Sequence, residues 1–333
     1  MPWAGRPGGR DALEGVGRAS GRDALEGVGR VCGLDRPDVV GRAPRWDALD
    51  GGRGAGARPG PAGSCGQAGS TACPEHDVRG SARVETGRMR QTDALLDRFL
   101  AGLAPASPLA VWAHGSLPAG DYVEGRSDLD LIAVLPQPPG PGAVWRVAVL
   151  HNRLRAEPLA GGLHCTYLSP DTADDAGRRH LTWAHELLLR RPVTPVTRAE
   201  LHTSGRVLHG APPADVLPPV PDGELAAFVL RDQRAYWRPY VDRADLWTRD
   251  VWVDLGMLTH ARAAVTLREG RLISKREALD VLPGLGAPEE VVEDIRARRY
   301  GGPVTADAAW PLRRAALVRG YLGPAIDALA AGS

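Results

Sequence analysis

Apolar side chains recur at helical spacing through residues 92–103. Leu95, Leu96, Phe99 and Leu103 fall on one stripe, and Leu100 widens it. Spacings of three and four residues predict an amphipathic helix with one buried face. Residues 1–88 show no comparable apolar periodicity, so this helix is the first element that the pattern supports.

Short continuous apolar runs follow this helix. They cover residues 109–113, 129–135, 143–150 and 163–168. Runs of this length are typical of strands that are buried on both faces. The second run stops before the prolines between Pro136 and Pro141, which a strand cannot cross. After Asp171 the pattern changes to a helical period, so we predict an α+β fold with a small mixed sheet over residues 89–210.

Residues 222–331 carry only helical signals, and a proline-rich stretch at 210–221 separates them from the sheet. Gly270 is a suitable C-terminal residue for the first helix, because glycine adopts the left-handed conformation without strain. Ser274 and Glu277 form a capping-box pattern that begins the next helix. We therefore predict an all-helical C-terminal domain with helices at residues 248–268, 274–282, 288–300 and 311–330.

The N-terminal segment, residues 1–88, has a different character. The decamer GRDALEGVGR occurs twice, beginning at Gly9 and Gly21. A chain this rich in glycine and arginine buries too little apolar surface to offset the entropy lost on ordering. We predict a disordered, low-complexity tail, and Met89 is a candidate for the true start of translation.

Composition excludes several classes of function. The 333 residues carry 41 basic and 40 acidic side chains, a formal net charge of +1, which argues against nucleic acid as a partner and against a polybasic membrane patch. No apolar run approaches the roughly 18 residues that a membrane span needs. The four cysteines cannot form a disulfide framework in a chain of this length. We expect a cytoplasmic monomer that acts on a small molecule.

The most informative stretch joins two of the predicted strands. Gly115 and Ser116 follow the first strand, where a turn can offer backbone N–H groups to phosphate oxygens. Ser127 precedes Asp128 and Asp130, whose spacing of two in a strand places both carboxylates on one face. Two carboxylates so close repel each other unless a cation lies between them, and Mg²⁺ bound to phosphates is such a cation. Each half of the pattern alone is also compatible with ordinary turn chemistry.

The pattern GS…SDLDL resembles the signature of the polymerase-beta-like nucleotidyltransferases. Later segments, MLTHARAAVTLREGRLISKREAL and RARRYGG, resemble the aminoglycoside (streptomycin/spectinomycin) adenylyltransferases, which have a helical C-terminal domain. The resemblance covers about residues 94–329 and none of the tail. It implies a nucleotidyltransferase domain at 89–210 and transfer of AMP from ATP to a hydroxyl of a small cationic acceptor, an aminoglycoside.

The resemblance also implies roles for individual residues around the nucleotide. Asp128 and Asp130 match the two Mg²⁺ ligands, and Ser116 and Ser127, with Gly115, match the positions that hold the triphosphate. A basic pair and a tyrosine from the helical domain match groups that reach the phosphates; these are Arg262, Lys275 and Tyr300. Lys275 is the only lysine of the chain, and an ammonium is a suitable point charge for a polyphosphate.

One position departs from the family. Where the family has a glutamate that acts as general base, this sequence has His164. A neutral imidazole can accept the proton of an attacking hydroxyl, because its ordinary pKa near 6.5 suits that task. Glu157 is a second candidate for this role. The alternative is a structural histidine in a catalytically silent relic of the fold that binds a nucleotide or ligand.

A cationic acceptor requires acidic and aromatic neighbours. Asp245 and Asp250 match the family's two acceptor-binding aspartates most closely, with Asp254 as an alternative, and Trp183 is the candidate aromatic wall. The competing interpretation is that the aspartates cap helices or pair with arginines and that the tryptophan belongs to the core. A nucleic-acid nucleotidyltransferase of antitoxin type is disfavoured by the neutral charge.

Overall fold

The computed structural model describes residues 78–302 and 307–332, with side chains from residue 91 onward. The predicted tail lies outside the described residues up to position 77, and from Val78 the backbone is helical. The first helix of the described residues, α2, spans Val78–Leu103 and so begins ahead of Met89. Its predicted stripe is buried, since Leu95, Phe99 and Leu103 are each at most 2% exposed.

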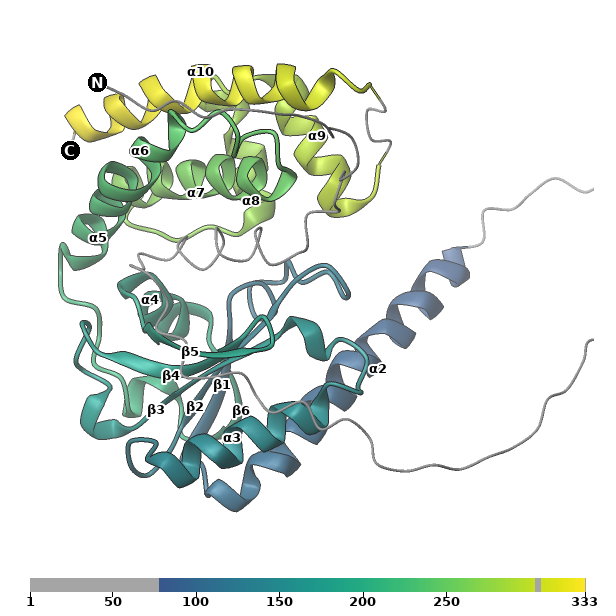
Figure 1. Cartoon of the computed structure of the whole chain (residues 1–333), viewed down its shortest axis with the longest axis vertical. Coiled ribbons are helices and arrows are strands. Elements are labelled where there is room, and N and C mark those ends of the chain that lie inside the picture. The colour runs from purple at the N-terminus through teal and green to yellow at the C-terminus, as the bar shows by residue number, and fades with distance from the viewer. Residues whose placement is uncertain (1–77, 303–306, 333) are drawn as a thin grey trace, which may run out of the picture.

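The fold is of the α+β class and contains a six-stranded mixed sheet (Figure 1). The strand order is β5-β4-β3-β2-β1-β6. Neighbouring strands are antiparallel except β2 and β3, which run parallel. The strands are β1 (Ala110–His114), β2 (Leu129–Val134), β3 (Leu163–Leu168), β4 (Arg179–Ala184), β5 (Leu187–Pro192) and β6 (Arg206–Gly210).

The prediction of a strand at residues 143–150 is wrong, because this segment belongs to helix α3 (Pro141–Leu154). Pro141 occupies the first helical turn, where its missing N–H costs nothing. The buried side chains Val147, Leu150 and Leu154 recur at helical spacing. A helix is also what the topology requires, since the parallel strands β2 and β3 need a crossover connection.

The prediction of a helical period after Asp171 is also wrong for residues 179–192, where β4 and β5 form a hairpin. Its two-residue turn consists of His185 and Glu186, both with positive φ (50° and 59°). Such turns normally carry asparagine or glycine, so His185 and Glu186 are not a recognisable turn signal. Helix α4 (Pro195–Ser204) and strand β6 follow the hairpin.

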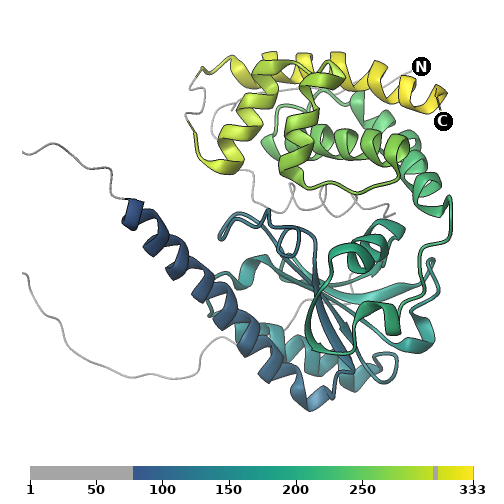
Figure 2. The same cartoon turned by 180° about the vertical axis from the view of Figure 1, so that it is seen from behind.

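The two faces of the sheet pack on different elements. Leu129, Leu131 and Ala133 of β2 share one apolar cluster with residues of α2 and α3. Ile132 and Val134 face the other way and join a smaller cluster with Leu201 of α4. Helices α2 and α3 therefore cover one face, while α4 lies on the other face, between the sheet and the C-terminal helices (Figures 1 and 2).

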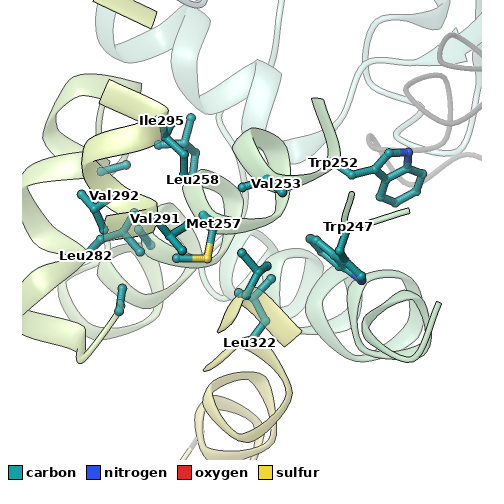
Figure 3. Close-up of a cluster of buried hydrophobic side chains, with 14 of the residues drawn as sticks. Trp247, Trp252, Val253, Met257, Leu258, Leu282, Val291, Val292, Ile295 and Leu322 are labelled. Atoms are coloured by element: carbon teal, nitrogen blue, oxygen red, sulfur yellow. The ribbon is translucent and has the colours of Figure 1, made fainter. Parts of the chain in front are cut away.

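The C-terminal helices have their own apolar core around α7 (Figure 3). Trp247, Val253 and Met257 are completely buried in it. Gly270 ends α7 in the left-handed conformation, and Ser274 and Glu277 form the predicted capping box. The helices are α5 (Glu224–Asp232), a π-helical turn (Gln233–Trp237), α6 (Arg238–Val241), α7 (Asp250–Glu269), α8 (Lys275–Val281), α9 (Glu289–Tyr300) and α10 (Trp310–Ala331).

Short 3₁₀ turns complete the described chain: Ala104–Ala106, Ala160–Gly162, Pro170–Thr172, Pro213–Asp215 and Pro283–Leu285. The proline-rich connection from β6 to α5 contains one of them. Within the described ranges, no helix combines the length and apolar character needed to cross a membrane.

Candidate functional site

Three side chains meet at one end of the sheet because of strand register. Asp130 of β2 pairs with His114 of the antiparallel strand β1 and with His164 of the parallel strand β3. Paired residues of neighbouring strands share a face. These groups therefore lie on the α4 face, opposite the apolar layer that contains Leu131.

Asp128 and Asp130 reach the same imidazole. The distance from His164 Nδ1 to Asp130 Oδ1 is 3.4 Å, and Nε2 lies 3.9 Å from Asp128 Oδ1. The spacing of two residues thus brings both carboxylates to one place, as the sequence predicts. The side chain of Asp128 is 53% exposed and that of Asp130 34%, so both are accessible to a ligand.

The loop after β1 is held close to this carboxylate pair. Gly115 has φ of 69°, and a Cβ atom there would lie 3.1 Å from Asp130 Oδ2, so only glycine fits without strain. The Ser127 hydroxyl accepts the N–H of Val123 at 3.0 Å, which closes the far end of the loop and leaves the hydroxyl proton to donate elsewhere. Ser116 accepts the N–H of Asp121 through its carbonyl at 3.0 Å.

The two carboxylates have opposite pKa shifts. Burial raises the pKa of Asp130, but the His164 hydrogen bond and the charges of His114 and Lys275 outweigh it and hold the pKa well below its usual range. Burial also raises the pKa of Asp128, and there the opposing charge of His164 does not compensate. Asp130 is therefore the more acidic member of the pair.

The imidazole of His164 is fixed on two sides. The contact of Asp130 with Nδ1 requires a proton on that nitrogen, so the neutral form of the ring has its lone pair on Nε2. Nε2 is buried and has no hydrogen-bond partner. The ring of His185, from the strained β4–β5 turn, packs edge-on against His164 with centroids 4.5 Å apart. Burial and neighbouring positive charge lower the pKa of His185 to about 4, so this ring is neutral at pH 7.

The C-terminal helices contribute a cation to the site. Lys275 is the first residue of α8. Burial lowers the pKa of its ammonium, the charge of Arg299 lowers it further, and the charges of Asp130 and Asp128 oppose both effects. The ammonium therefore lies within electrostatic reach of the carboxylate pair, although it is more than a hundred residues away in sequence.

Arg262, the predicted partner of Lys275, is engaged with a residue that sequence reasoning missed. Its Nη2 donates to Glu200 of α4 at 2.7 Å, and its Nε donates to the Ile273 carbonyl at 2.9 Å. Glu200 also lies 3.4 Å from His114 Nδ1. Burial lowers the pKa of His114, but Glu200 and the charge of Asp130 outweigh it, so the pKa is raised. Glu200 could not be recognised from the sequence, because a single glutamate on a helix is common and no motif surrounds it.

Asp121 is the second residue that the sequence did not single out. This carboxylate is only 3% exposed and accepts hydrogen bonds from the Tyr300 hydroxyl at 2.8 Å and from the Arg276 backbone at 3.0 Å. Tyr300, expected near the phosphates, is thus tied to the loop between β1 and β2. Arg126 of the same loop donates to the carbonyls of Arg298 and Arg299 at the end of α9. The loop is therefore docked on two C-terminal helices.

The assignment of Trp183 to the acceptor site is wrong. Trp183 pairs with Cys165 across β3 and β4, so its side chain lies on the sheet face opposite His164. It is 2% exposed and stacks on His151 with ring centroids 4.6 Å apart. Burial between the sheet and α3 excludes contact with an acceptor beside the carboxylates.

The three candidate acceptor aspartates are paired with arginines. Asp245 is exposed and lies 3.3 Å from Arg243, apart from the other two. Asp250 and Asp254 of α7 both pair with Arg298, and Asp250 also lies 2.6 Å from a nitrogen of Arg314. The structure thus brings Asp250 and Asp254 together but supplies them with positive charge from α9 and α10.

A surface hollow of about 760 Å³ lies elsewhere, between the Pro283–Leu285 turn and α10. Leu285, Pro288, Leu317 and Tyr321 contribute to its walls. None of its lining residues is an acid or a histidine, so it does not coincide with the chemical groups described above.

Comparison with known proteins agrees with the geometry at the level of the fold. The structure is similar to that of a spectinomycin adenyltransferase from Enterococcus faecialis, crystallised with ATP and spectinomycin, with a TM-score of 0.52. The likeness shows a nucleotidyltransferase-like fold. It covers 72% of this chain and 99% of that one, at 14% sequence identity. No known family profile and no curated protein matches the sequence.

Proposed function

We propose that this protein is a nucleotidyltransferase that transfers AMP from ATP to a hydroxyl of a small acceptor. The observation that carries the proposal is the convergence of Asp128 and Asp130 with the ammonium of Lys275. Acids for a metal ion and a cation for phosphate oxygens, brought together from the sheet and from α8, are the groups that nucleotide triphosphate chemistry needs.

A divalent metal ion fits the residues present. Asp128 and Asp130 offer two carboxylates on one face, and the buried Nε2 of His164 is a polar atom without a partner beside them. Such an ion would neutralise the triphosphate and favour ionisation of the attacking hydroxyl. Within the described ranges, no three His, Cys, Asp or Glu side chains are placed to hold a metal ion by themselves, so phosphate oxygens would have to complete the coordination.

The protein's own groups have separate tasks in this proposal. Gly115 keeps the loop backbone close to Asp130, and Ser116 and Ser127 offer hydroxyl donors to the triphosphate. Lys275 supplies a point charge to the same phosphates. Arg262 joins it when phosphate competes with Glu200 for the guanidinium.

The acceptor that we propose is a small hydroxylated cation of the aminoglycoside class. The similar structure was crystallised with spectinomycin, which supports this class by analogy of fold. Of the two α7 acids, Asp250 is the more accessible to an acceptor, since its side chain is 63% exposed whereas that of Asp254 is 18% exposed, although both pair with Arg298.

The test is transfer of labelled AMP. The purified chain is incubated with ATP labelled at the α-phosphate, a divalent ion and a panel of aminoglycosides. We expect labelled product and released pyrophosphate, both abolished by Asp130→Asn and retained by Asp280→Asn, an exposed carboxylate of α8. A protein that binds metal–ATP but labels no acceptor overturns the proposal.

A second candidate is a catalytically silent nucleotide-binding protein of the same fold. It is favoured by one observation, the imidazole of His164 where the resemblance implies a glutamate. His164→Glu distinguishes the two functions. Transfer activity that appears only in this variant would show that the native protein is silent, and lower activity in the variant than in the native protein would exclude silence.

A further inference from the structure

Glu200 holds the arginine that the proposed function assigns to nucleotide phosphate. Its Oε1 atom accepts a hydrogen bond from Arg262 Nη2 at 2.7 Å. The pair joins α4, which lies on the sheet, to α7 of the C-terminal helices (Figures 1 and 2). Both side chains are mostly buried, with 16% of Glu200 and 28% of Arg262 exposed. Hydrogen bonds between two charged groups are among the strong ones, so this contact is not an incidental surface pair.

The Glu200 carboxylate is an anion close to the proposed phosphate site. Burial raises its pKa, but the hydrogen bond with His114 and the charge of Arg262 outweigh burial and lower the pKa, so Glu200 is ionised at pH 7. Burial and the charge of Arg299 lower the pKa of Lys275, and the charge of Arg262 lowers it further. Arg262 therefore lies within electrostatic reach of Lys275, the other cation proposed for phosphate. Glu200 thus occupies a cation of that site with a negative charge of the protein itself.

Glu200 has a second partner that remains if Arg262 leaves. Its Oε2 atom lies 3.4 Å from Nδ1 of His114, the last residue of β1. A mostly buried carboxylate left without any partner would be strongly destabilised, and His114 removes part of that cost. Arg262 also keeps a second contact, since its Nε donates to the Ile273 carbonyl at 2.9 Å. The pair can therefore separate without isolating either charge, provided that another anion takes the guanidinium.

We propose that Glu200 is a built-in competitor of nucleotide phosphate, which holds Arg262 until a triphosphate displaces it and so weakens the binding of ATP and of released pyrophosphate. This inference rests on the proposed function, because it concerns the same phosphate site. The exchange breaks the hydrogen bond from Nη2 to Oε1 and forms one from Nη2 to a phosphate oxygen, and no covalent bond changes. Weaker binding of pyrophosphate favours its release, and product release limits turnover in many enzymes.

A different role for Glu200 would be to position Arg262 and to stay bound to it when ATP binds. The two roles predict opposite effects of Glu200→Gln. Glutamine has nearly the same size, and its carbonyl oxygen can still accept from Arg262, so positioning persists while the negative charge is lost. Hydrogen bonds between two charged groups are about twice as strong as neutral ones, so phosphate displaces an amide more easily than a carboxylate. Competition therefore predicts tighter binding in the variant, whereas positioning predicts equal or weaker binding.

The first test compares the full-length native protein with Glu200→Gln. Calorimetry in the presence of Mg²⁺ gives the dissociation constants of a non-hydrolysable ATP analogue and of pyrophosphate. We expect Glu200→Gln to lower both constants about 10-fold. Asp280→Asn, which removes an exposed carboxylate of α8, is the control and should leave both constants unchanged. A merely structural contact would not tighten the binding of two different ligands when it is weakened.

The second test needs no variant. A crystal structure of the native protein with Mg²⁺ and the same analogue should show Arg262 Nη2 bound to a phosphate oxygen. We expect Glu200 to be out of hydrogen-bond distance of Arg262 in this complex and to remain beside His114.

The outcomes separate this inference from the proposed function. If Glu200→Gln binds both ligands as the native protein does, or more weakly, Glu200 is not a competitor and the inference is overturned. If the variant binds more tightly but the native complex keeps the hydrogen bond between Nη2 and Oε1, the effect is general charge repulsion and the inference also fails. If the native protein binds neither the analogue nor pyrophosphate, the proposed function is overturned as well.

Discussion

Replacement of Asp121 by asparagine tests how the loop between β1 and β2 is joined to the C-terminal helices. Asp121 accepts the Tyr300 hydroxyl and the Arg276 N–H, and the Arg276 guanidinium lies 3.6 Å from the same carboxylate. Asparagine keeps the size but loses the charge and one acceptor oxygen. Its amide N–H₂ would face a donor in a place that is almost closed to water.

The magnitude follows from these contacts. A buried donor left without an acceptor costs about 1–3 kcal/mol, and the lost charge weakens the Arg276 contact further. The substitution therefore destabilises the docking of the loop on α8, which brings Lys275, the neighbour of Arg276, toward Asp128 and Asp130. If the docked arrangement is the one that binds nucleotide, ATP affinity should fall about 10-fold to 100-fold, since each factor of ten is about 1.4 kcal/mol.

Two measurements check this prediction. Guanidinium unfolding gives the free energy of unfolding, and calorimetry with a non-hydrolysable ATP analogue gives the dissociation constant. Asp280→Asn on the same helix is the matched control, because Asp280 is 59% exposed and pairs with Arg296 at the surface. Exposed pairs contribute at most about 1 kcal/mol, so this control should bind ATP normally. Asp121→Asn with the stability and ATP affinity of Asp280→Asn would refute the reasoning.

Three further predictions concern packing and pH. Gly256→Ala should lower the thermal unfolding midpoint, at a cost of about 1–3 kcal/mol, because its Cβ would lie 2.6 Å from a buried indole, whereas Gly320→Ala in open space should not. Burial lowers the pKa of His260 to about 4, so the unfolded chain takes up the proton first as the pH drops. The free energy of unfolding should therefore fall between pH 6.5 and pH 4. In guanidinium unfolding of His260→Gln this fall should be smaller by up to about 3 kcal/mol. Glu200→Gln should lower the raised pKa of His114, measured by NMR titration.

The sign for His114 follows from its raised pKa. The protonated form stabilises the fold below the unfolded value of 6.5, and this contribution is lost as the pH rises through the folded pKa. In Glu200→Gln the contribution of protonated His114 to the free energy of unfolding should be smaller over this whole pH range. A His114 titration that is unchanged in Glu200→Gln would contradict the contact between these two residues. Equal unfolding midpoints of Gly256→Ala and Gly320→Ala would contradict the packing described at Gly256. A pH dependence of His260→Gln identical to that of the native protein would contradict a buried, neutral His260.

Local signals predicted much of the fold. Gly270, Ser274 and Glu277 act within one or two turns of chain, so the ends of α7 and α8 could be predicted without knowledge of their neighbours. The same holds for the alternation of Asp128 and Asp130 with apolar residues. A feature that depends on four or five successive residues is seldom changed by contacts with distant parts of the chain.

The errors arose where tertiary context decides. The apolar run at 143–150 is compatible with a strand or a helix, and only the parallel pairing of β2 with β3 requires the helix. The prediction of Trp183 at the acceptor site is wrong because the pattern does not reveal strand β4, whose register places this side chain on the face opposite His164. Asp121 and Glu200 could not be found, since their partners are on helices far away in sequence.

The alternation along β2 limits how this chain can change in length. Adding or deleting one residue inside Leu129–Val134 would turn every later side chain to the opposite face. A carboxylate would then lie in the apolar layer that packs on α3, and a leucine would occupy the position of the acid on the α4 face. Insertions should therefore accumulate in connections such as residues 136–140, while the strand itself keeps its residue count in any descendant that retains the chemistry.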